Sequence, residues 1–80
     1  MKNIITNYKE NNYIQDFINN YYNFIIDNEI TTGEALQLAT DLQGYSEETL
    51  NDVLYIKCGY RDLEQLYDCE VENFDWSLFE

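Results

Sequence analysis

Apolar residues recur at the spacing of a helix face between residues 12 and 28. The recurring positions are Ile14, Phe17, Ile18, Tyr21, Tyr22 and Ile25. The polar positions between them are Asp16, Asn20, Asn23 and Asp27. Because residues three and four apart share one side of a helix, the first set forms an apolar side and the second set lies on the opposite, solvated side. The pattern predicts an amphipathic helix over this segment.

A second helix is predicted to begin near Thr31. Thr31 precedes Glu34 by three residues, and a hydroxyl and a carboxylate at this spacing can each accept a hydrogen bond from an unpaired backbone N–H at a helix start. The apolar positions that follow are Ala35, Leu36, Leu38, Ala39 and Leu42. Gly44 is expected to end the helix, since glycine takes the left-handed conformation at little cost.

Two further helices are predicted before the C-terminal segment. Ser46 is suited to cap a third helix, and Glu47 and Glu48 in its first turn lie near the positive end of the helix dipole. Gly59 is expected to end this helix, and a short fourth helix is predicted from residue 61 to about residue 68. The apolar residues of the two helices are Leu50, Val53, Leu54, Leu63, Leu66 and Tyr67.

Acidic and large apolar residues alternate in the C-terminal segment from Glu70 to Trp76. This alternation fits three structures: a strand, an arm that packs its rings on the helices, or a segment that folds on binding. The packed arm is favoured, because a lone strand has no partner strand here. The sequence therefore predicts an all-α fold, a compact bundle of about four helices with an acidic, aromatic C-terminal arm, as a single domain over residues 1–80.

The composition is that of a chain that folds. Apolar residues make up 45% of the 80 residues, which is more than a disordered acidic tail contains. A domain of this size buries only roughly 60–65% of the surface that its unfolded chain exposes, so the core is expected to be thin. Of the eight tyrosines, Tyr21, Tyr22 and Tyr67 lie at core spacing. The candidates for surface rings are Tyr8, Tyr45, Tyr55 and Tyr60.

The charge is strongly one-sided. Sixteen acidic residues and four basic residues give a net charge of −12 and a pI near 4.1. Direct binding to nucleic acid is disfavoured, because affinity for a phosphate backbone comes from Lys and Arg, and anionic membrane surfaces are disfavoured for the same reason. A basic protein surface remains as the partner.

The chain lacks the residues and motifs that most classes of enzyme use for catalysis. There is no histidine and no glycine-rich phosphate loop, and Cys58 and Cys69 stand without the second pair that a zinc site of four soft ligands needs. Carboxylate pairs such as Glu48 with Asp52 are explained by a solvated helix face more readily than by acid–base catalysis or metal binding. The chain is therefore predicted not to be an enzyme and to need no metal or cofactor.

No apolar run approaches the ~18 residues that span a bilayer, and no secretion signal is evident. The expected location is the cytoplasm of a bacterial cell, where the two cysteines stay reduced.

The acids lack neighbouring bases. No basic residue occurs from Glu10 through Ile56, and seven acids follow from Asp62 to Glu80 with no base among them. Carboxylates without counterions repel one another, and a basic partner offsets that cost. Twelve charges correspond to roughly 20 Å of duplex DNA, so the folded body is predicted to occupy a protein groove built for phosphates. An acidic surface that serves only solubility is the alternative.

The candidate partner-binding residues comprise ten acids and one aromatic anchor. They are Glu34, Asp41, Glu47, Glu48, Asp52, Asp62, Glu64, Asp68, Glu70, Glu72 and Trp76.

Three segments carry a family resemblance. At Thr31-Thr32-Gly33-Glu34-Ala35-Leu36-Gln37-Leu38, Ser46-Glu47-Glu48-Thr49-Leu50-Asn51-Asp52-Val53-Leu54 and Tyr60-Arg61-Asp62-Leu63-Glu64-Gln65-Leu66 the chain resembles the middle helical domain of ArdA-type antirestriction proteins. The three segments lie within residues 31–66. Those proteins are acidic DNA mimics of mobile elements. The chain lacks the flanking domains that give that family its DNA-like length, so a full restriction-complex footprint would need a homodimer. In size and charge it is also similar to phage anti-CRISPR proteins, which block basic channels of CRISPR effectors.

The resemblance implies an inhibitor of a nucleic-acid-binding defence enzyme, either a restriction complex or a CRISPR effector. An antitoxin or regulatory adaptor that binds a basic protein without DNA mimicry is the alternative. Its contacts are expected at the apolar residues of the arm more than at the acids. Those residues are Val71, Phe74, Trp76, Leu78 and Phe79.

Overall fold

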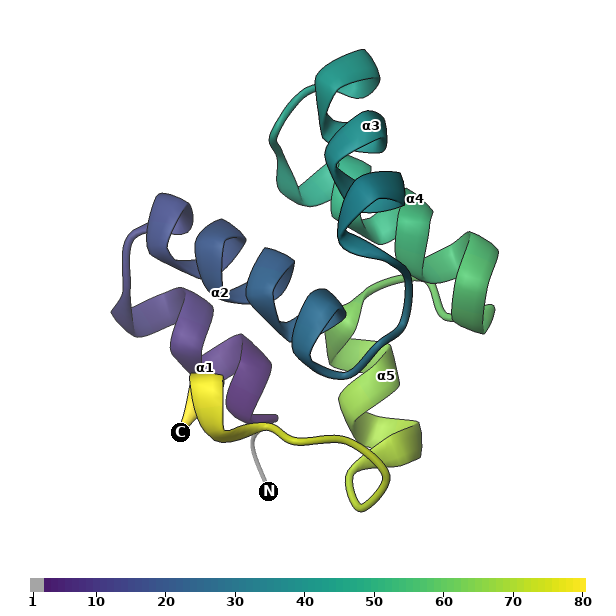
Figure 1. Cartoon of the computed structure of the whole chain (residues 1–80). Helices are drawn as coiled ribbons and strands as arrows, with labels where there is room; N and C mark the ends of the chain where they lie inside the picture. The colour runs from purple at the N-terminus through teal and green to yellow at the C-terminus, as the bar shows by residue number, and fades with distance from the viewer. Residues whose placement is uncertain (1–2) are drawn as a thin grey trace.

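The computed structural model describes residues 3–80, and these form α-helices and one short 3-10 helix (Figure 1). In chain order the elements are α1 (Ile4–Asn11), α2 (Ile14–Asp27), α3 (Gly33–Gln43), α4 (Glu47–Cys58), α5 (Leu63–Glu70) and η1 (Ser77–Phe79). No strand occurs in this part of the chain, so the predicted all-α bundle with a C-terminal arm is confirmed. The molecule measures 36 × 26 × 19 Å along its principal axes.

Helix α1 is an element that the sequence pattern did not predict. It packs against α2, α5 and η1. Its first turn is capped by Asn3, whose side-chain oxygen accepts a hydrogen bond from the N–H of Ile5 at 2.8 Å. Ile5 is the residue of this helix that is fully buried. A helix of two turns with one buried side chain leaves too short an apolar pattern to predict.

Helix α2 confirms the predicted amphipathic helix, but its buried residues differ in part from those predicted. The buried residues are Phe17, Ile18, Tyr21, Phe24 and Ile25. Ile14 was expected among them but is 55% exposed, because it is the first residue of the helix. Asn20, expected on the solvated side, instead donates hydrogen bonds from its amide to the Tyr8 hydroxyl at 2.8 Å and to the Leu78 carbonyl at 3.0 Å.

The start of α3 lies one residue later than predicted. Thr32, and not Thr31, is the cap, and its hydroxyl accepts a hydrogen bond from the N–H of Ala35 at 3.1 Å. At the end of the helix, Gly44 has a positive φ of 105° as expected, but its ψ of 152° is extended and not left-handed helical.

The caps of α4 follow the prediction, and α5 begins later than predicted. The Ser46 hydroxyl accepts a hydrogen bond from the N–H of Thr49 at 3.4 Å, and Gly59 ends α4 in the left-handed conformation. Helix α5 begins at Leu63 because Asp62 caps it, accepting a hydrogen bond from the N–H of Gln65 at 2.9 Å.

The C-terminal arm closes one side of the core. In Figure 1 it runs from the end of α5 back to α1, and η1 contacts both α1 and α2. The indole of Trp76 stacks on Phe24 with ring centroids 4.6 Å apart. Phe79 and Tyr8 form a T-shaped pair with ring centroids 5.5 Å apart. Two hydrogen bonds join Asn28 to the backbone of Asp75, at 2.9 and 3.4 Å. The packed arm predicted from the sequence is therefore the observed structure.

Candidate interaction surface

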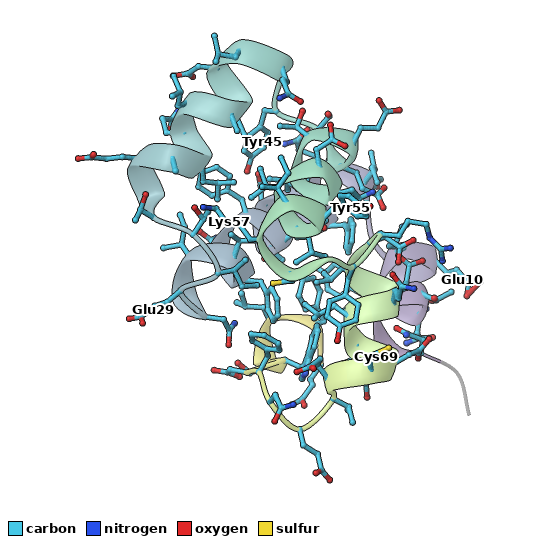
Figure 2. The ribbon with its side chains drawn as sticks, turned by 90° about the vertical axis from the view of Figure 1, so that its right-hand side faces the viewer. Glu10, Glu29, Tyr45, Tyr55, Lys57 and Cys69 are labelled. Carbon is cyan, nitrogen blue, oxygen red and sulfur yellow. The ribbon has the colours of Figure 1, made fainter. Side chains whose placement is uncertain are left out.

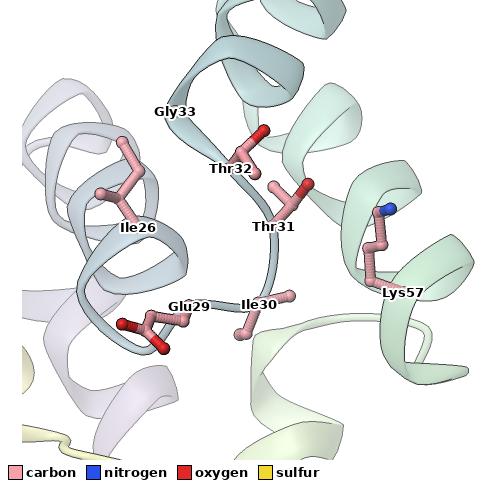
Figure 3. A pocket seen from close by; sticks show the side chains of 7 residues that line it. All are labelled: Ile26, Glu29, Ile30, Thr31, Thr32, Gly33 and Lys57. Carbon is pink, nitrogen blue, oxygen red and sulfur yellow. The ribbon is translucent and has the colours of Figure 1, made fainter.

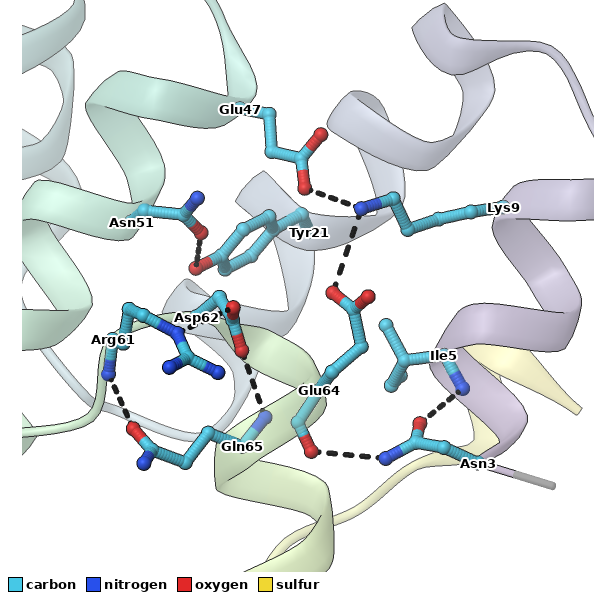
Figure 4. Close-up of polar contacts among 10 residues, drawn as sticks. All are labelled: Asn3, Ile5, Lys9, Tyr21, Glu47, Asn51, Arg61, Asp62, Glu64 and Gln65. Atoms are coloured by element: carbon cyan, nitrogen blue, oxygen red, sulfur yellow. Dashed lines mark hydrogen bonds and ion pairs between the residues drawn. The ribbon is translucent and has the colours of Figure 1, made fainter.

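Two of the predicted partner-binding acids belong to an internal ion-pair cluster (Figure 4). The ammonium of Lys9 lies 2.7 Å from the carboxylate of Glu47 and 3.5 Å from that of Glu64. The three side chains are 25–29% exposed. Burial alone would lower the pKa of Lys9, but the hydrogen bond to Glu47 and the two negative charges raise it above its usual value. Glu47 and Glu64 therefore hold α1 against α4 and α5.

Three more of these acids also have partners inside the molecule. Asp62 caps α5 and pairs with the Arg61 guanidinium at 3.2 Å. Asp68 accepts a hydrogen bond from the Asn3 amide at 2.9 Å. Glu70 accepts hydrogen bonds from the Tyr60 hydroxyl at 3.1 Å and from the Asn73 amide. These carboxylates therefore make contacts within the fold, and both oxygens of Asp62 and of Glu70 are engaged in them.

Trp76 is not a surface anchor. It was expected to contact a partner, but it is 6% exposed and lies between Phe24 and Tyr67, with centroids 4.6 and 5.0 Å away. Its indole N–H is buried without a hydrogen-bond partner in residues 3–80. Phe79 was expected as an anchor of the adaptor alternative, but it is 4% exposed because it also packs on core rings such as Phe24. Val71, in contrast, is 48% exposed. The rings of the arm are core residues.

Four acids remain exposed on the α3–α4 hairpin. They are Glu34, Asp41, Glu48 and Asp52. Across residues 3–80 the ion pairs involve Lys9 and Arg61, and none of these four carboxylates takes part in one. Asp41 accepts a hydrogen bond from the neutral Gln37 amide at 2.9 Å. Glu72 in the arm is likewise exposed. The hairpin thus carries a group of carboxylates that take no part in the ion pairs of the described residues.

Large apolar side chains share these exposed helix faces. Leu38 and Leu42 of α3 are 58% and 76% exposed, and Tyr55 and Ile56 of α4 are 64% and 76% exposed. We refer to the exposed side of α3 and the exposed side of α4, taken as one set of residues, as the α3–α4 outer face. It consists of Glu34, Leu38, Asp41, Leu42, Glu48, Asp52, Tyr55 and Ile56.

Helical periodicity produces this face on both helices. In each helix the four residues follow the spacing i, i+4, i+7, i+8, which keeps them on one side. The opposite sides, with Leu36 on α3 and with Leu50 and Leu54 on α4, are fully buried. Figure 2 looks onto α4, with Tyr55 on one side of the helix and Lys57 on the other.

Leu38 and Leu42 are two of the apolar positions on which the prediction of α3 was based, but they do not face the core. Successive residues turn by about 100° around a helix, so Leu36 and Leu38 point to nearly opposite sides. Because Leu36 faces the core, Leu38 faces solvent. A helical projection of the three leucines is the signal in the sequence that reveals this exposed pair.

A groove lies between the end of α2, the start of α3 and the end of α4 (Figure 3). Its volume is about 580 Å³, and its lining is Ile26, Glu29, Ile30, Thr31, Thr32, Gly33 and Lys57. The Glu29 carboxylate and the Lys57 ammonium point in different directions in Figure 3. The polar groups of the groove therefore do not converge on one position, as they do in a specific small-molecule site.

No group of three or more His, Cys, Asp and Glu side chains in residues 3–80 is placed to hold a metal ion. Cys58 is half-buried and Cys69 is exposed, and both are free thiols. Burial raises the pKa of the Cys58 thiol, with a smaller contribution from the Glu70 charge, so its reactive thiolate form is disfavoured. None of the helices within this range is long and apolar enough to cross a bilayer.

Comparison with known proteins gives no relative for this chain. No protein-family model matches it, and no curated protein or solved structure is significantly similar to it.

Proposed function

We propose that this protein inhibits a nucleic-acid-binding enzyme of a bacterial defence system by occupying its basic groove as an acidic DNA mimic. The target class is a restriction complex or a CRISPR effector. The observation that carries the proposal is the group of exposed carboxylates at Glu34, Asp41, Glu48 and Asp52, which take part in none of the ion pairs of residues 3–80. A phosphate-reading groove presents the Lys and Arg that such a group lacks.

The density of charge on the molecule is compatible with this role. A net charge of −12 over a longest dimension of 36 Å gives about one charge per 3 Å, compared with one per roughly 1.7 Å for duplex DNA and per roughly 3.4 Å for a single strand. The protein is thus closer to one strand than to a duplex. We infer that it fits a channel that holds a single strand, or one side of a duplex groove.

The ion pairs of residues 3–80 lie near the meeting point of α1, α4 and α5, where Lys9 pairs with Glu47 and Glu64, and Arg61 pairs with Asp62. The exposed acids of α3 and α4 take part in none of these pairs, and neither do the acids Asp16, Asp27, Glu29 and Glu80 elsewhere on the surface. A basic partner would therefore approach the hairpin in preference to the α1–α5 side of the molecule.

The antitoxin or adaptor function remains the second candidate, and a specific observation favours it. Mimicry of phosphates needs no apolar side chains, yet Leu42 and Ile56 are each 76% exposed next to the acids. The predicted contacts of this candidate in the arm are largely buried, so its contacts would lie on the α3–α4 outer face.

Nucleic-acid cleavage by a purified restriction complex and by a purified CRISPR effector tests the proposal. The protein should inhibit cleavage by one of them, and inhibition should weaken with added salt and with excess DNA. Neutralising the four hairpin acids (Glu34→Gln, Asp41→Asn, Glu48→Gln, Asp52→Asn) should weaken inhibition by roughly tenfold or more, since close charge pairs at interfaces are each worth about 1.5 kcal/mol or more.

A matched control removes the same number of exposed charges elsewhere. Asp16→Asn, Asp27→Asn, Glu29→Gln and Glu80→Gln change side chains that are exposed and take part in none of the ion pairs of residues 3–80. The control should keep most of the inhibition. Equal loss in both variants would mean that net charge alone acts, and inhibition that resists both salt and DNA would favour the adaptor function.

A further inference from the structure

Helix α3 has an apolar side that faces solvent. Its buried residues are Leu36 and Thr40, and α4 is the helix on which it mainly packs. In Figure 1 it lies at the edge of the molecule, beside α4 and apart from α1 and α5. On the other side of the helix, Leu38 and Leu42 are 58% and 76% exposed, and Ala35 is exposed as well. More than half of each leucine is therefore left uncovered by the rest of residues 3–80.

The uncovered side has the spacing at which two helices pair. Ala35, Leu38 and Leu42 stand at i, i+3 and i+7, which are the a, d and a positions of a heptad. Glu34 and Asp41 then both fall at g positions, which flank the apolar residues. We call these five residues the α3 seam. In paired helices the a and d residues pack into the partner, and the e and g residues form ion pairs across the contact.

Charge sets the chemistry of a helix that would fit the α3 seam. Glu34 and Asp41 are exposed, and neither takes part in an ion pair of residues 3–80. Lysine or arginine beside the apolar residues of a partner helix would pair with both carboxylates, whereas acidic residues there would repel them. We infer that the α3 seam binds a heptad-patterned helix of a partner protein, with apolar residues at its a and d positions and basic residues beside them.

A second copy of this chain does not meet these requirements. If two α3 helices paired antiparallel, their g positions would face each other, so that Glu34 of one copy would oppose Asp41 of the other. If they paired parallel, Glu34 would face the e position, which is the uncharged Ala39. Each copy also carries a net charge of −12. Two copies thus gain no ion pair in either orientation and repel each other over longer distances.

The contact is confined to α3. Its 11 residues extend over roughly 16 Å, so the partner would contribute about three helical turns. Helix α4 does not extend the seam, because its exposed apolar residues Tyr55 and Ile56 are adjacent in the sequence and point about 100° apart. The exposed side of α4 therefore provides a matched control for that of α3.

This inference goes beyond the proposed function and does not rest on it. Glu34 and Asp41 belong to both contacts, but the leucines of the α3 seam have no counterpart in a contact that mimics phosphates. Apolar burial adds a component of binding that salt does not screen. Binding of a helix can also be measured without any nucleic-acid-binding enzyme, so the two ideas can fail separately.

Three designed peptides of two heptads each serve as probes. The first has leucine at its a and d positions and lysine at its e and g positions, the second has the same residues in scrambled order, and the third has glutamate in place of lysine. Titrated into the isotope-labelled full chain, the first peptide should bind roughly tenfold more tightly than either of the others. The backbone amide shifts that it causes should be concentrated on α3.

The apolar part of the contact is tested by a matched pair of variants. Leu38→Gln with Leu42→Gln removes the two leucines of the α3 seam, and Tyr55→Gln with Ile56→Gln removes two exposed apolar side chains of α4. The first variant should bind the basic heptad peptide roughly tenfold more weakly, whereas the second should bind it as the wild type does. Because all four side chains are more than half exposed, both variants should keep the circular dichroism of the wild type.

The charged part of the contact is tested in the same way. Glu34→Gln with Asp41→Asn removes two carboxylates of the α3 seam, and Glu48→Gln with Asp52→Asn removes two from the exposed side of α4. Since exposed ion pairs are each worth up to about 1 kcal/mol, the first variant should bind the basic heptad peptide roughly fivefold more weakly. It should also bind the basic and the acidic peptides with more similar affinities, while the second variant keeps the preference of the wild type.

Several results would overturn the inference. They are equal binding of the basic heptad peptide and its scrambled form, amide shifts centred outside α3, and equal effects of the α3 and α4 variants. Self-association of the wild type that is lost in the Leu38→Gln, Leu42→Gln variant would identify a second copy as the occupant and would also overturn it. If the peptide results hold but no cleavage is inhibited, the proposed function fails and the inference stands. If cleavage is inhibited and the peptides bind alike, the reverse is true.

Discussion

Lys9 connects α1 to three other helices through one ammonium group. Its Nζ atom lies 2.7 Å from the Glu47 carboxylate on α4, 3.5 Å from that of Glu64 on α5 and 5.2 Å from the centre of the Phe17 ring on α2. Without that cation, the two half-buried carboxylates would face each other with no charge between them. In a chain with so few bases, this residue has a disproportionate effect on stability.

Replacing Lys9 with methionine keeps the apolar stem and removes the charge. We expect the free energy of unfolding to fall by about 1 kcal/mol, allowing for the partial exposure of the group, which corresponds to roughly 5 °C in Tm. Lys57→Met is the control, because Lys57 forms no ion pair within residues 3–80. Thermal unfolding of the three proteins gives the comparison, and equal changes in both variants would contradict the assigned role.

The same substitution has a defined pH dependence. Because the folded state raises the pKa of Lys9 above 10.5, the folded protein holds this proton more tightly than the unfolded chain. The stabilisation is therefore fully present below pH 10.5 and is lost as the pH rises through the folded pKa. The difference in Tm between wild type and Lys9→Met should stay constant from neutral pH to about 10 and should shrink only above that range.

At the scale of the elements, much of the fold follows from local rules. The apolar spacing of α2, the Ser46 cap and the terminating Gly59 are local features, so the sequence was sufficient to predict them. Helix α1 is different, because it is held by long-range contacts such as that between the Asn3 amide and the Glu64 carbonyl at 2.9 Å. No pattern within eight residues reveals a partner 61 residues away.

The candidate surface was predictable in part for the same reason. That the acids lie on solvated helix faces follows from periodicity. Which of them are neutralised depends on where Lys9 and Arg61 lie in three dimensions, and the sequence gives no distance between Lys9 and Glu47. The burial of Trp76 likewise depends on the path of the arm back to Phe24.

At the start of α3, alanine substitutions of two adjacent threonines should have different effects on the free energy of unfolding. Thr32→Ala removes the hydroxyl that accepts from the N–H of Ala35, so the free energy of unfolding should fall by about 1 kcal/mol. Thr31→Ala leaves the cap intact and should change stability by less than about 0.5 kcal/mol. Chemical denaturation measures both variants. If Thr31→Ala were the more costly change, the helix would begin where the sequence pattern first placed it.

At the scale of the whole molecule, the unbalanced charge works against folding. A net charge of −12 is confined to a body with a radius of gyration of 11.8 Å, and expansion on unfolding relieves the repulsion. The Debye length falls from roughly 30 Å at 0.01 M salt to roughly 3 Å at 1 M, so added salt screens these charges.

The Tm should therefore rise by several degrees between low and high sodium chloride. The variant with the four hairpin acids neutralised has its net charge reduced from −12 to −8, and its Tm should start higher and rise less. A salt response of equal size in both proteins would show that repulsion on the α3–α4 outer face does not limit stability. Calorimetric scans across the salt series provide the measurement.

Because Trp76 stacks on Phe24, the intrinsic tryptophan fluorescence of the protein reports on the packing of the C-terminal arm. The chain has one tryptophan, and it lies in the arm, whereas the far-ultraviolet dichroism arises from the helices. The emission wavelength of the tryptophan thus reports on the docking of the last ten residues, and the far-ultraviolet ellipticity reports on the helices. If the arm is an integral part of the core, the two signals change together on heating. An emission shift at lower temperature would instead reveal a state in which the helices persist and the aromatic side of the core is open to a partner.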